Sequence, residues 1–288
     1  MLYDDTRAGV EYVFGDRIAK LTQDAEGVDA TLASGRQRRF ELVVGADGLH
    51  SALRAMVFGP REEFVRHLGL VLGFYTVPNE FGVDGWMIDY QDQVTGRSAG
   101  LRPLKDATKA IAMLSFPATE FNVDHRDISA QKQLLREQMA GFGWETARIL
   151  SHLDDTPDFY LDQVAQVVMD HWSLGRVGLL GDAAFSASPM SGAGTGLALV
   201  GAYMLAGELA TAGWDAEAGF AGYEQRMRDY VEANQDIGRM HVESIVGPGP
   251  GAEEGPEPDM EALMPIIELA VGGPQLPEYD YAPTLTSR

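Results

Sequence analysis

The sequence predicts an α/β fold with a β-rich middle and a helical C-terminal part. Two short apolar runs, Leu42–Gly45 and Arg176–Leu180, are typical of buried strands, and each precedes a predicted helix. Between them, residues 64–116 form long stretches of alternating apolar and polar side chains, which indicates strands with one buried face. Long helical patterns at about 191–212 and 217–242 follow the second run. This order of elements favours an α/β architecture.

The first part of the chain predicts short elements separated by turn residues. We expect a helix at 2–7, a strand at Val10–Phe14 and a small meander at 18–21, 28–32 and 37–40. Asp24, Gly27 and Gly35 are ordinary turn residues between the strands of the meander. After the apolar run, Ser51 is placed to cap a helix at 52–58, and Gly59 with the following proline ends that helix.

The middle and the end of the chain differ sharply in composition. We expect strands at 65–77, 85–91, 97–101, 110–116 and 159–169, and helices at 128–139 and 144–153. After Val246 the chain is acidic and rich in proline and glycine, and it carries one basic residue, Arg288. We expect one short helix there, at 260–270, although Pro265 interrupts its pattern. The rest of the tail is expected to be wrapped on the surface or disordered.

Composition and charge exclude several classes of partner. The chain has 43 acidic and 22 basic residues and a net charge of −21, so its surface repels nucleic acid and anionic membranes. It has no cysteine, which excludes disulfides and thiolate metal sites and is compatible with a reducing cytoplasm. No signal peptide is visible at Met1–Asp5, and the most apolar stretch, Gly192–Leu209, is too short and glycine-rich for a membrane span. We expect a cytoplasmic protein whose oligomeric state is left open.

The first chemical motif lies between a buried strand and a long helix, where ligands bind in α/β sheets. It reads Gly181-Asp182-Ala183-Ala184 and continues with Pro189-Met190-Ser191-Gly192-Ala193-Gly194-Thr195-Gly196. The carboxylate of Asp182, just past the strand, can accept hydrogen bonds from sugar hydroxyls. Without side chains at the glycines, a planar ring can approach the start of the helix, whose free N–H groups suit an anion or a polarised carbonyl.

The second motif repeats this arrangement. Gly45-Ala46-Asp47-Gly48-Leu49-His50-Ser51 closes the first apolar strand and leads into a helix, with Arg54 further along. Each motif also has a purely structural interpretation: a glycine-rich helix packed on a neighbour, and a strand–turn–helix with Asp47 in an Asx turn. The occurrence of both motifs in one chain favours the functional interpretation.

Other chemistry has weaker support. The six histidines lack metal-ligand spacing, and the serines near residue 188 lack the G-x-S-x-G pattern of hydrolases, so we predict no metal site and no catalytic amino-acid side chain. Several side chains of the middle segment are candidates to line a substrate pocket, although alternation would point about half of them to solvent. These candidates are Tyr75, Trp86, Tyr90, Arg97 and Arg102.

The two motifs together resemble the DG and GD motifs of class A flavoprotein monooxygenases, which have the para-hydroxybenzoate hydroxylase fold. The resemblance runs from Val10 to about Ala212. It implies that Asp182 with Gly181 and Pro189 holds the ribityl or ribose part of FAD, and that Asp47 with Gly48 serves FAD and NAD(P)H binding. The backbone of Gly192, Ala193, Gly194 and Thr195 would face the pyrimidine edge of the flavin, and Ile18 would lie near adenine.

The resemblance also implies an architecture and an activity. A three-layer, Rossmann-like FAD-binding domain would comprise residues 1–58 and 158–212, interrupted by a β-rich substrate domain at 59–157. A C-terminal helix at 213–246 and an acidic tail at 247–288 would follow. NAD(P)H would reduce the flavin, and the reduced flavin would react with oxygen to oxygenate a small organic substrate, aromatic or polyketide-like. The cofactor carries this chemistry, and the protein supplies placement and exclusion of water.

Three features depart from the family pattern. Phe185 stands where the family usually has histidine, and Ala193 and Gly196 replace its glutamine and asparagine. The sequence contains no G-x-G-x-x-G motif, so we expect an N-terminally truncated FAD domain that binds FAD weakly unaided. Two alternatives therefore stay open: a flavin reductase or dehydrogenase of the same fold, and a non-catalytic fragment that does not hold FAD.

Overall fold

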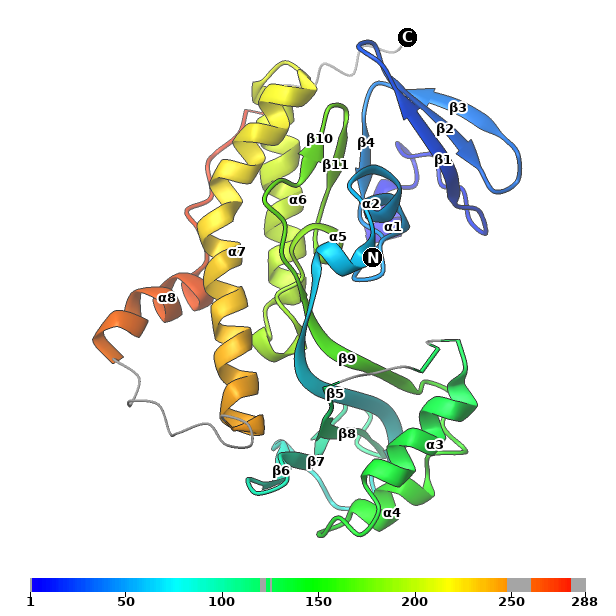
Figure 1. Cartoon of the computed structure of the whole chain (residues 1–288), viewed down its shortest axis with the longest axis vertical. Helices are drawn as coiled ribbons and strands as arrows, with labels where there is room; N and C mark the ends of the chain where they lie inside the picture. The colour runs from blue at the N-terminus through cyan, green and yellow to red at the C-terminus, as the bar shows by residue number, and fades with distance from the viewer. Residues whose placement is uncertain (1, 120–122, 125, 248–259, 281–288) are drawn as a thin grey trace.

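The computed structural model describes residues 2–119, 123–124, 126–247 and 260–280, which form a mixed α/β fold (Figure 1). Within this part of the chain the strands make three sheets: β1-β2-β3, β10-β11-β4 and β6-β7-β8-β5-β9. The first two sheets and α6 lie at one end of the molecule, and the five-stranded sheet with α3 and α4 lies at the other. Helix α7 runs from the first end to the five-stranded sheet, where its Val242 packs against Leu70 and Leu72. The sequence predicted most of these elements within a few residues of their observed bounds.

The N-terminal part contains a short helix and an antiparallel meander. The helix α1 spans Leu2–Thr6, and the meander comprises β1 (Ile18–Gln23), β2 (Val28–Leu32) and β3 (Gln37–Phe40). The predicted strand Val10–Phe14 is wrong: this segment has no strand structure, and Phe14 is 75% exposed. Instead of pairing with a neighbouring strand, its Tyr12 and Phe14 rings stack on each other at 5.8 Å beside Tyr3.

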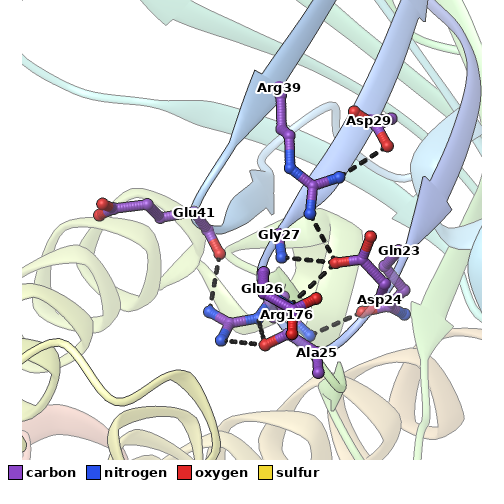
Figure 2. Close-up of polar contacts among 9 residues, drawn as sticks. All are labelled: Gln23, Asp24, Ala25, Glu26, Gly27, Asp29, Arg39, Glu41 and Arg176. Carbon is purple, nitrogen blue, oxygen red and sulfur yellow. Dashed lines mark hydrogen bonds and ion pairs between the residues drawn. The ribbon is translucent and has the colours of Figure 1, made fainter.

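Arg176 attaches the meander to the neighbouring sheet, as Figure 2 shows. Its guanidinium donates to the main-chain oxygens of Ala25, in the β1–β2 turn, and Glu41, just after β3. Its own amide donates to the side chain of Gln23, which in turn donates to the main-chain oxygen of Leu174. These bonds join segments about 150 residues apart in the sequence and fix the position of the meander.

The small sheet brings the two predicted motif strands side by side. β4 (Val43–Gly45) pairs in parallel with β11 (Val177–Leu179), and β10 (Ser173–Leu174) pairs antiparallel with β11 on its other edge. Gly45 lies opposite Leu179, and the amide of Leu180 donates to the oxygen of Gly45 at 2.8 Å. Because the pairing is parallel, the loops that follow both strands leave the same end of the sheet.

Two long strands connect this end of the molecule with the five-stranded sheet. β5 (Val65–Pro78) contributes Val65 to the core around β4, β11 and α6, and it contributes Tyr75 to a second core beneath α3 and α4. β9 (Tyr160–Val167) runs antiparallel to β5 and likewise extends from one core to the other. The remaining elements here are η1 (Arg61–Glu63), β6 (Ile88–Asp92), β7 (Arg97–Pro103), β8 (Lys109–Pro117), α3 (Ile128–Gln138) and α4 (Thr146–Ser151). The proposed domain limits near 58 and 157 stay predictions.

The C-terminal half consists mainly of helices. α6 (Gly194–Thr211) and α7 (Ala216–Val246) pack along each other, and α8 (Met260–Gly272) packs against α7 and retains Pro265 (Figure 1). Residues 273–280 run along α6, where Tyr279 donates to the carboxylate of Glu208 at 2.6 Å. The rest of the predicted tail, 248–259 and 281–288, lies outside the described residues. Of the described helices, none combines the length and apolarity that a membrane crossing requires.

Candidate functional site

The first loop of the candidate site is built around Asp47. Its carboxylate accepts hydrogen bonds from the Ser51 hydroxyl at 2.5 Å and from the amides of Ala52 and Leu53 at 2.8 and 3.1 Å. Ser51 in turn caps α2 (Ala52–Val57) by accepting from the amide of Arg54. Asp47 therefore has a structural role, but one that differs from the expected Asx turn: it accepts from the first amides of α2 and holds the start of that helix. Its predicted contact with a cofactor stays a prediction.

The second loop begins with Gly181 and Asp182. Gly181 has φ 62° and ψ −141°, a conformation that glycine adopts far more readily than other residues, and it starts the short helix α5 (Asp182–Phe185). The carboxylate of Asp182 keeps contact with solvent, but partial burial raises its pKa above the usual value, against a hydrogen bond from Ser186. A carboxylate in this position can accept hydrogen bonds from hydroxyl groups of a ligand.

Arg54 connects the two loops. Its side chain is 1% exposed, and its guanidinium donates to the main-chain oxygen of Leu49 at 2.6 Å and of Ala183 at 2.8 Å. Burial lowers its pKa, although the charge of Asp47 opposes that change. This buried guanidinium donates to one oxygen from each loop, while its Nε has no hydrogen-bond partner among the described residues, and it holds the two motifs at a fixed separation.

The start of α6 is open and lacks a side-chain cap. Helices α2, α3 and α7 are capped by Ser51, Asp127 and Asp215, whereas Ala193 at the N-cap of α6 makes no such bond. A Cβ added at Gly194 would have no heavy atom within 4 Å. The same openness is found at Gly192, which has the left-handed φ of 69° and follows the helical turn η2 (Pro189–Ser191). The start of α6 thus combines amides without a side-chain cap and open space beside its glycines, which fits a planar, electron-rich group.

The predicted binding residues do not all converge. The structure brings the loops of Asp47 and Asp182 to the same end of one small sheet, and α6 begins twelve residues after Asp182. Ile18, by contrast, belongs to the meander, where it opens β1 and packs against the adjoining core. Its predicted place near adenine is untested. Within the described residues no group of acidic residues and histidines could hold a metal ion.

The structure also adds residues that the sequence did not single out. His50, in the Asp47 loop, makes a 2.8 Å contact from Nε2 to Oδ2 of Asp162 on β9. Tyr160 donates to the same oxygen at 3.4 Å and stacks on Phe74 at 6.4 Å. Burial, together with the charge of Asp162, raises the pKa of Tyr160 to about 12. No local sequence signal could have found this cluster, because His50, Phe74 and the β9 pair of Tyr160 and Asp162 come from distant parts of the chain and meet only after folding.

Asp162 remains ionised within this cluster. Burial acts to raise the pKa of its carboxyl group. Hydrogen bonds from His50 and from the amide of Gln163, with the electrostatic effects of His50 and Arg61, outweigh that effect and lower the pKa. The Asp47 loop and the five-stranded sheet are therefore joined by the hydrogen bond between His50 and the carboxylate of Asp162.

Most of the side chains that the sequence suggested for a substrate pocket do not come together at one pocket. Tyr75 is buried on the helix-covered face of the sheet and donates to the main-chain oxygen of Ile149. Tyr90 packs on Phe142 and Trp144, and the guanidinium of Arg97 lies over the ring of Phe142, between α3 and α4. These placements contradict a shared pocket. The opposite face of the sheet carries Phe74, Tyr160 and Asp162 and, by strand alternation, Met113 and Arg102.

Comparison with known proteins agrees with this geometry. A family model described as "FAD binding domain" matches residues 1–237. The chain is 36% identical to a flavin-dependent monooxygenase of Legionella longbeachae over 96% of this chain and 70% of that protein. Among solved structures, it is similar to tetracycline destructase Tet(55), with 39% identity, a TM-score of 0.77 and coverage of 91% and 69% of the two chains. It is also similar to tetracycline destructase Tet(51), with 33% identity, a TM-score of 0.80 and coverage of 96% and 72%.

These likenesses cover nearly all of the present chain and about 70% of each relative. They extend over both motif loops, the five-stranded sheet and the helices α6 and α7, and the sequence identity is well above the level at which only the fold is shared. The chain therefore belongs to the FAD-binding domain family, among the flavin-dependent monooxygenases.

Proposed function

We propose that this chain binds FAD at the adjoining ends of β4 and β11 and uses it to oxygenate a small organic substrate, with NAD(P)H as the reductant. The observation that carries the proposal is the parallel pairing of the two motif strands, locked by Arg54 between Leu49 and Ala183. In this arrangement Asp182 accepts hydrogen bonds from ribityl or ribose hydroxyls, beside Gly181 and Pro189. Asp47 and Gly48 flank the same edge.

The start of α6 has the properties that the flavin ring requires. The amides of Gly194 and Thr195, at the uncapped start of α6, are available to the carbonyl edge of the ring, and the glycines leave room for it. The amides of Gly192 and Ala193 already donate to the main-chain oxygen of Pro189 and the hydroxyl of Ser191, so these two residues would flank the ring without supplying a free donor. The positive end of the helix stabilises negative charge there by about 0.3–1 kcal/mol. When bound, reduced FAD supplies the electrons that activate oxygen. The chain itself contributes the placement of the ring and the exclusion of water.

The proposed substrate surface is the region around Phe74 and Tyr160, beside the part of the same sheet face that packs against Val242 of α7. Phe74 and Tyr160 offer stacked rings that suit a planar apolar substrate, and Asp162 with His50 provides a polar edge next to them. We therefore place an aromatic or polyketide-like substrate against this face. The tetracycline destructases among the relatives support a polycyclic substrate.

A single set of assays distinguishes the candidate functions. The purified protein is supplied with FAD, NADH or NADPH and a panel of phenolic and polycyclic compounds under ¹⁸O₂, and NAD(P)H oxidation and the product mass are recorded. A monooxygenase incorporates one ¹⁸O atom into the product and consumes one NAD(P)H for it. Substrate-dependent NAD(P)H oxidation without incorporated oxygen would instead favour the reductase or dehydrogenase alternative. A colourless protein that never binds FAD would favour the non-catalytic fragment.

A further inference from the structure

Helix α7 packs against the segment of residues 186–190, which leads from Asp182 to the start of α6. Three residues of α7, spaced three apart along the helix, meet this segment in order. Gln235 donates from Nε2 to the main-chain oxygen of Ser186 at 3.5 Å and to that of Val167 at 2.8 Å. Further along α7, His241 donates from Nδ1 to the main-chain oxygen of Met190 at 3.0 Å.

Between these two contacts the helix touches the segment through Gly238. A Cβ placed on Gly238 would lie 2.4 Å from the main-chain oxygen of Ala187 and 2.8 Å from the hydroxyl of Ser188. The first of these atoms belongs to backbone and cannot move aside as a flexible side chain would. Only glycine therefore permits the observed approach of α7 to the segment.

A buried glutamine on β9, Gln166, also contacts this segment. Gln166 is 1% exposed and donates to the main-chain oxygens of Ala187 and Gln235 at 3.2 and 2.6 Å. Its own oxygen accepts a hydrogen bond from Arg239. Side chains that belong to neither motif therefore donate hydrogen bonds to main-chain oxygens of the 186–190 segment.

The segment held in this way is strained. Ser188 has φ 75°, a region that residues with a side chain rarely occupy, and its buried hydroxyl has no hydrogen-bond partner among the described residues. Such a conformation persists where the surrounding structure enforces it, and it is found preferentially at functional sites. The contacts from α7 and Gln166 are the neighbours that enforce it here.

The strained segment in turn determines where α6 begins. The amide and the hydroxyl of Ser191 both donate to the main-chain oxygen of Ser188, and the amide of Gly192 donates to that of Pro189. The amide of Ala193 donates to the hydroxyl of Ser191. Hydrogen bonds therefore continue from the contact with α7 to Ala193, the residue just before the α6 amides proposed to face the flavin.

We propose that the face of α7 formed by Gln235, Gly238 and His241 is a positioning element, which holds the 186–190 segment in its strained form and so aligns the α6 amides with the flavin. The proposal rests on the proposed function for the identity of the ligand. These residues touch the loop backbone and act on the cofactor only through it.

The test compares two alanine substitutions on the same helix. Gly238→Ala places a methyl group against the oxygen of Ala187, whereas in Gly222→Ala, the matched control, the nearest atoms belong to the side chain of Glu208 and not to backbone. Amide hydrogen exchange of residues 186–195 is measured without FAD, and the dissociation constant for FAD is measured by flavin fluorescence. We expect Gly238→Ala to speed exchange in this segment and weaken FAD binding, each by about tenfold. Gly222→Ala should change neither.

Two further variants keep the test decisive if Gly238→Ala folds poorly. Gln235→Met preserves volume but removes the hydrogen bond donors to Val167 and Ser186, and it should also speed exchange at 186–195. Ser188→Gly relieves the positive φ, so it should restore much of the protection lost in the Gln235→Met variant. If these α7 residues only stabilise the protein in general, their substitution would instead speed exchange throughout α7, and adding Ser188→Gly would not restore protection.

Failure of this inference is distinguishable from failure of the proposed function. If the wild-type protein binds no FAD, the proposed function fails, while the exchange measurements without FAD still decide the positioning role. If the wild-type protein binds FAD, but Gly238→Ala and Gln235→Met leave exchange at 186–195 and FAD affinity unchanged, the positioning role is overturned.

Discussion

Arg54 donates a 2.8 Å hydrogen bond to the main-chain oxygen of Ala183, across 129 residues of sequence. Its second donor bonds to the main-chain oxygen of Leu49, so this one buried side chain sets the distance between the two motif loops. The cofactor site proposed here depends on that distance, because a single FAD molecule must contact both loops. Several substitutions test this relationship and its consequences.

Arg54→Met should destabilise the protein strongly. The substitution keeps much of the buried volume but leaves the oxygens of Leu49 and Ala183 without a charged donor, at about 1–3 kcal/mol for each buried group. Arg66→Met is the matched control, since exposed Arg66 also donates to two main-chain oxygens, those of Glu62 and Glu63. Urea unfolding should show a loss of about 2–5 kcal/mol for Arg54→Met and less than about 1 kcal/mol for Arg66→Met. Equal losses would contradict the role of Arg54 as a link between the loops.

Asp182→Ala should lower FAD affinity more than Asp47→Ala does. Asp182 presents its carboxylate to solvent at the site, whereas both oxygens of Asp47 already accept bonds from the start of α2. Conversely, Asp47→Ala should reduce thermal stability, by about 1 kcal/mol as for a lost helix cap. Flavin fluorescence titration and thermal unfolding of both variants give the two rankings. The same FAD affinity in both variants would remove the distinction between them.

Gly194→Asp should separate ligand binding from helix packing. The added side chain enters open space, and a negative charge at the uncapped start of α6 stabilises the helix by about 0.3–1 kcal/mol. The apoprotein should therefore keep or slightly increase its melting temperature, while FAD affinity falls because the charge faces the flavin edge. Gly194→Ala is the control for the side chain without its charge. A stable Gly194→Asp protein with wild-type FAD affinity would place the flavin elsewhere.

Stability should decline as the pH falls from about 4 to about 2, in part through Asp158. Partial burial acts to raise the pKa of its carboxyl group, but hydrogen bonds from Thr156 and from the hydroxyl and amide of Thr76 outweigh it and lower the pKa to about 2. An unfolded aspartate titrates near pKa ~3.9, so the stabilisation is complete above that pH and is lost as the pH falls through the native value. Asp158→Asn should make the pH dependence of urea unfolding shallower in this window. Asp155→Asn, at an exposed neighbour, should leave it unchanged.

The sequence predicted the parts of the fold that have local signals. The buried strands at 43–45 and 177–179 are short apolar runs, and the loops after them carry glycine and aspartate in a specific order. Their parallel pairing brings Asp47 and Asp182 to one end of a sheet, in accord with the motif prediction. Val10–Phe14 was wrong because strand-forming residues also need a partner strand, and here their rings pack on one another at the surface.

The sequence could not predict contacts that depend on tertiary packing. The pair formed by His50 and Asp162 joins a loop to a strand far along the chain, and nothing in the sequence around either residue indicates that the two are in contact. The alternation of side chains along β5 and β7 could be predicted from the sequence. The face of the sheet that α3 and α4 cover could not. Tyr75 and Arg97 were therefore assigned to a substrate pocket that they do not share.

The most direct test is amide hydrogen exchange of the protein with and without FAD, read by mass spectrometry across the whole sequence. If the adjoining ends of β4 and β11 form the flavin site, FAD should slow exchange in peptides covering residues 46–50 and 182–196 together. The α3 and α4 helices at the far end of the molecule should not respond. Protection confined to other segments, or protection of one loop without the other, would contradict a single flavin site built from the Asp47 and Asp182 loops.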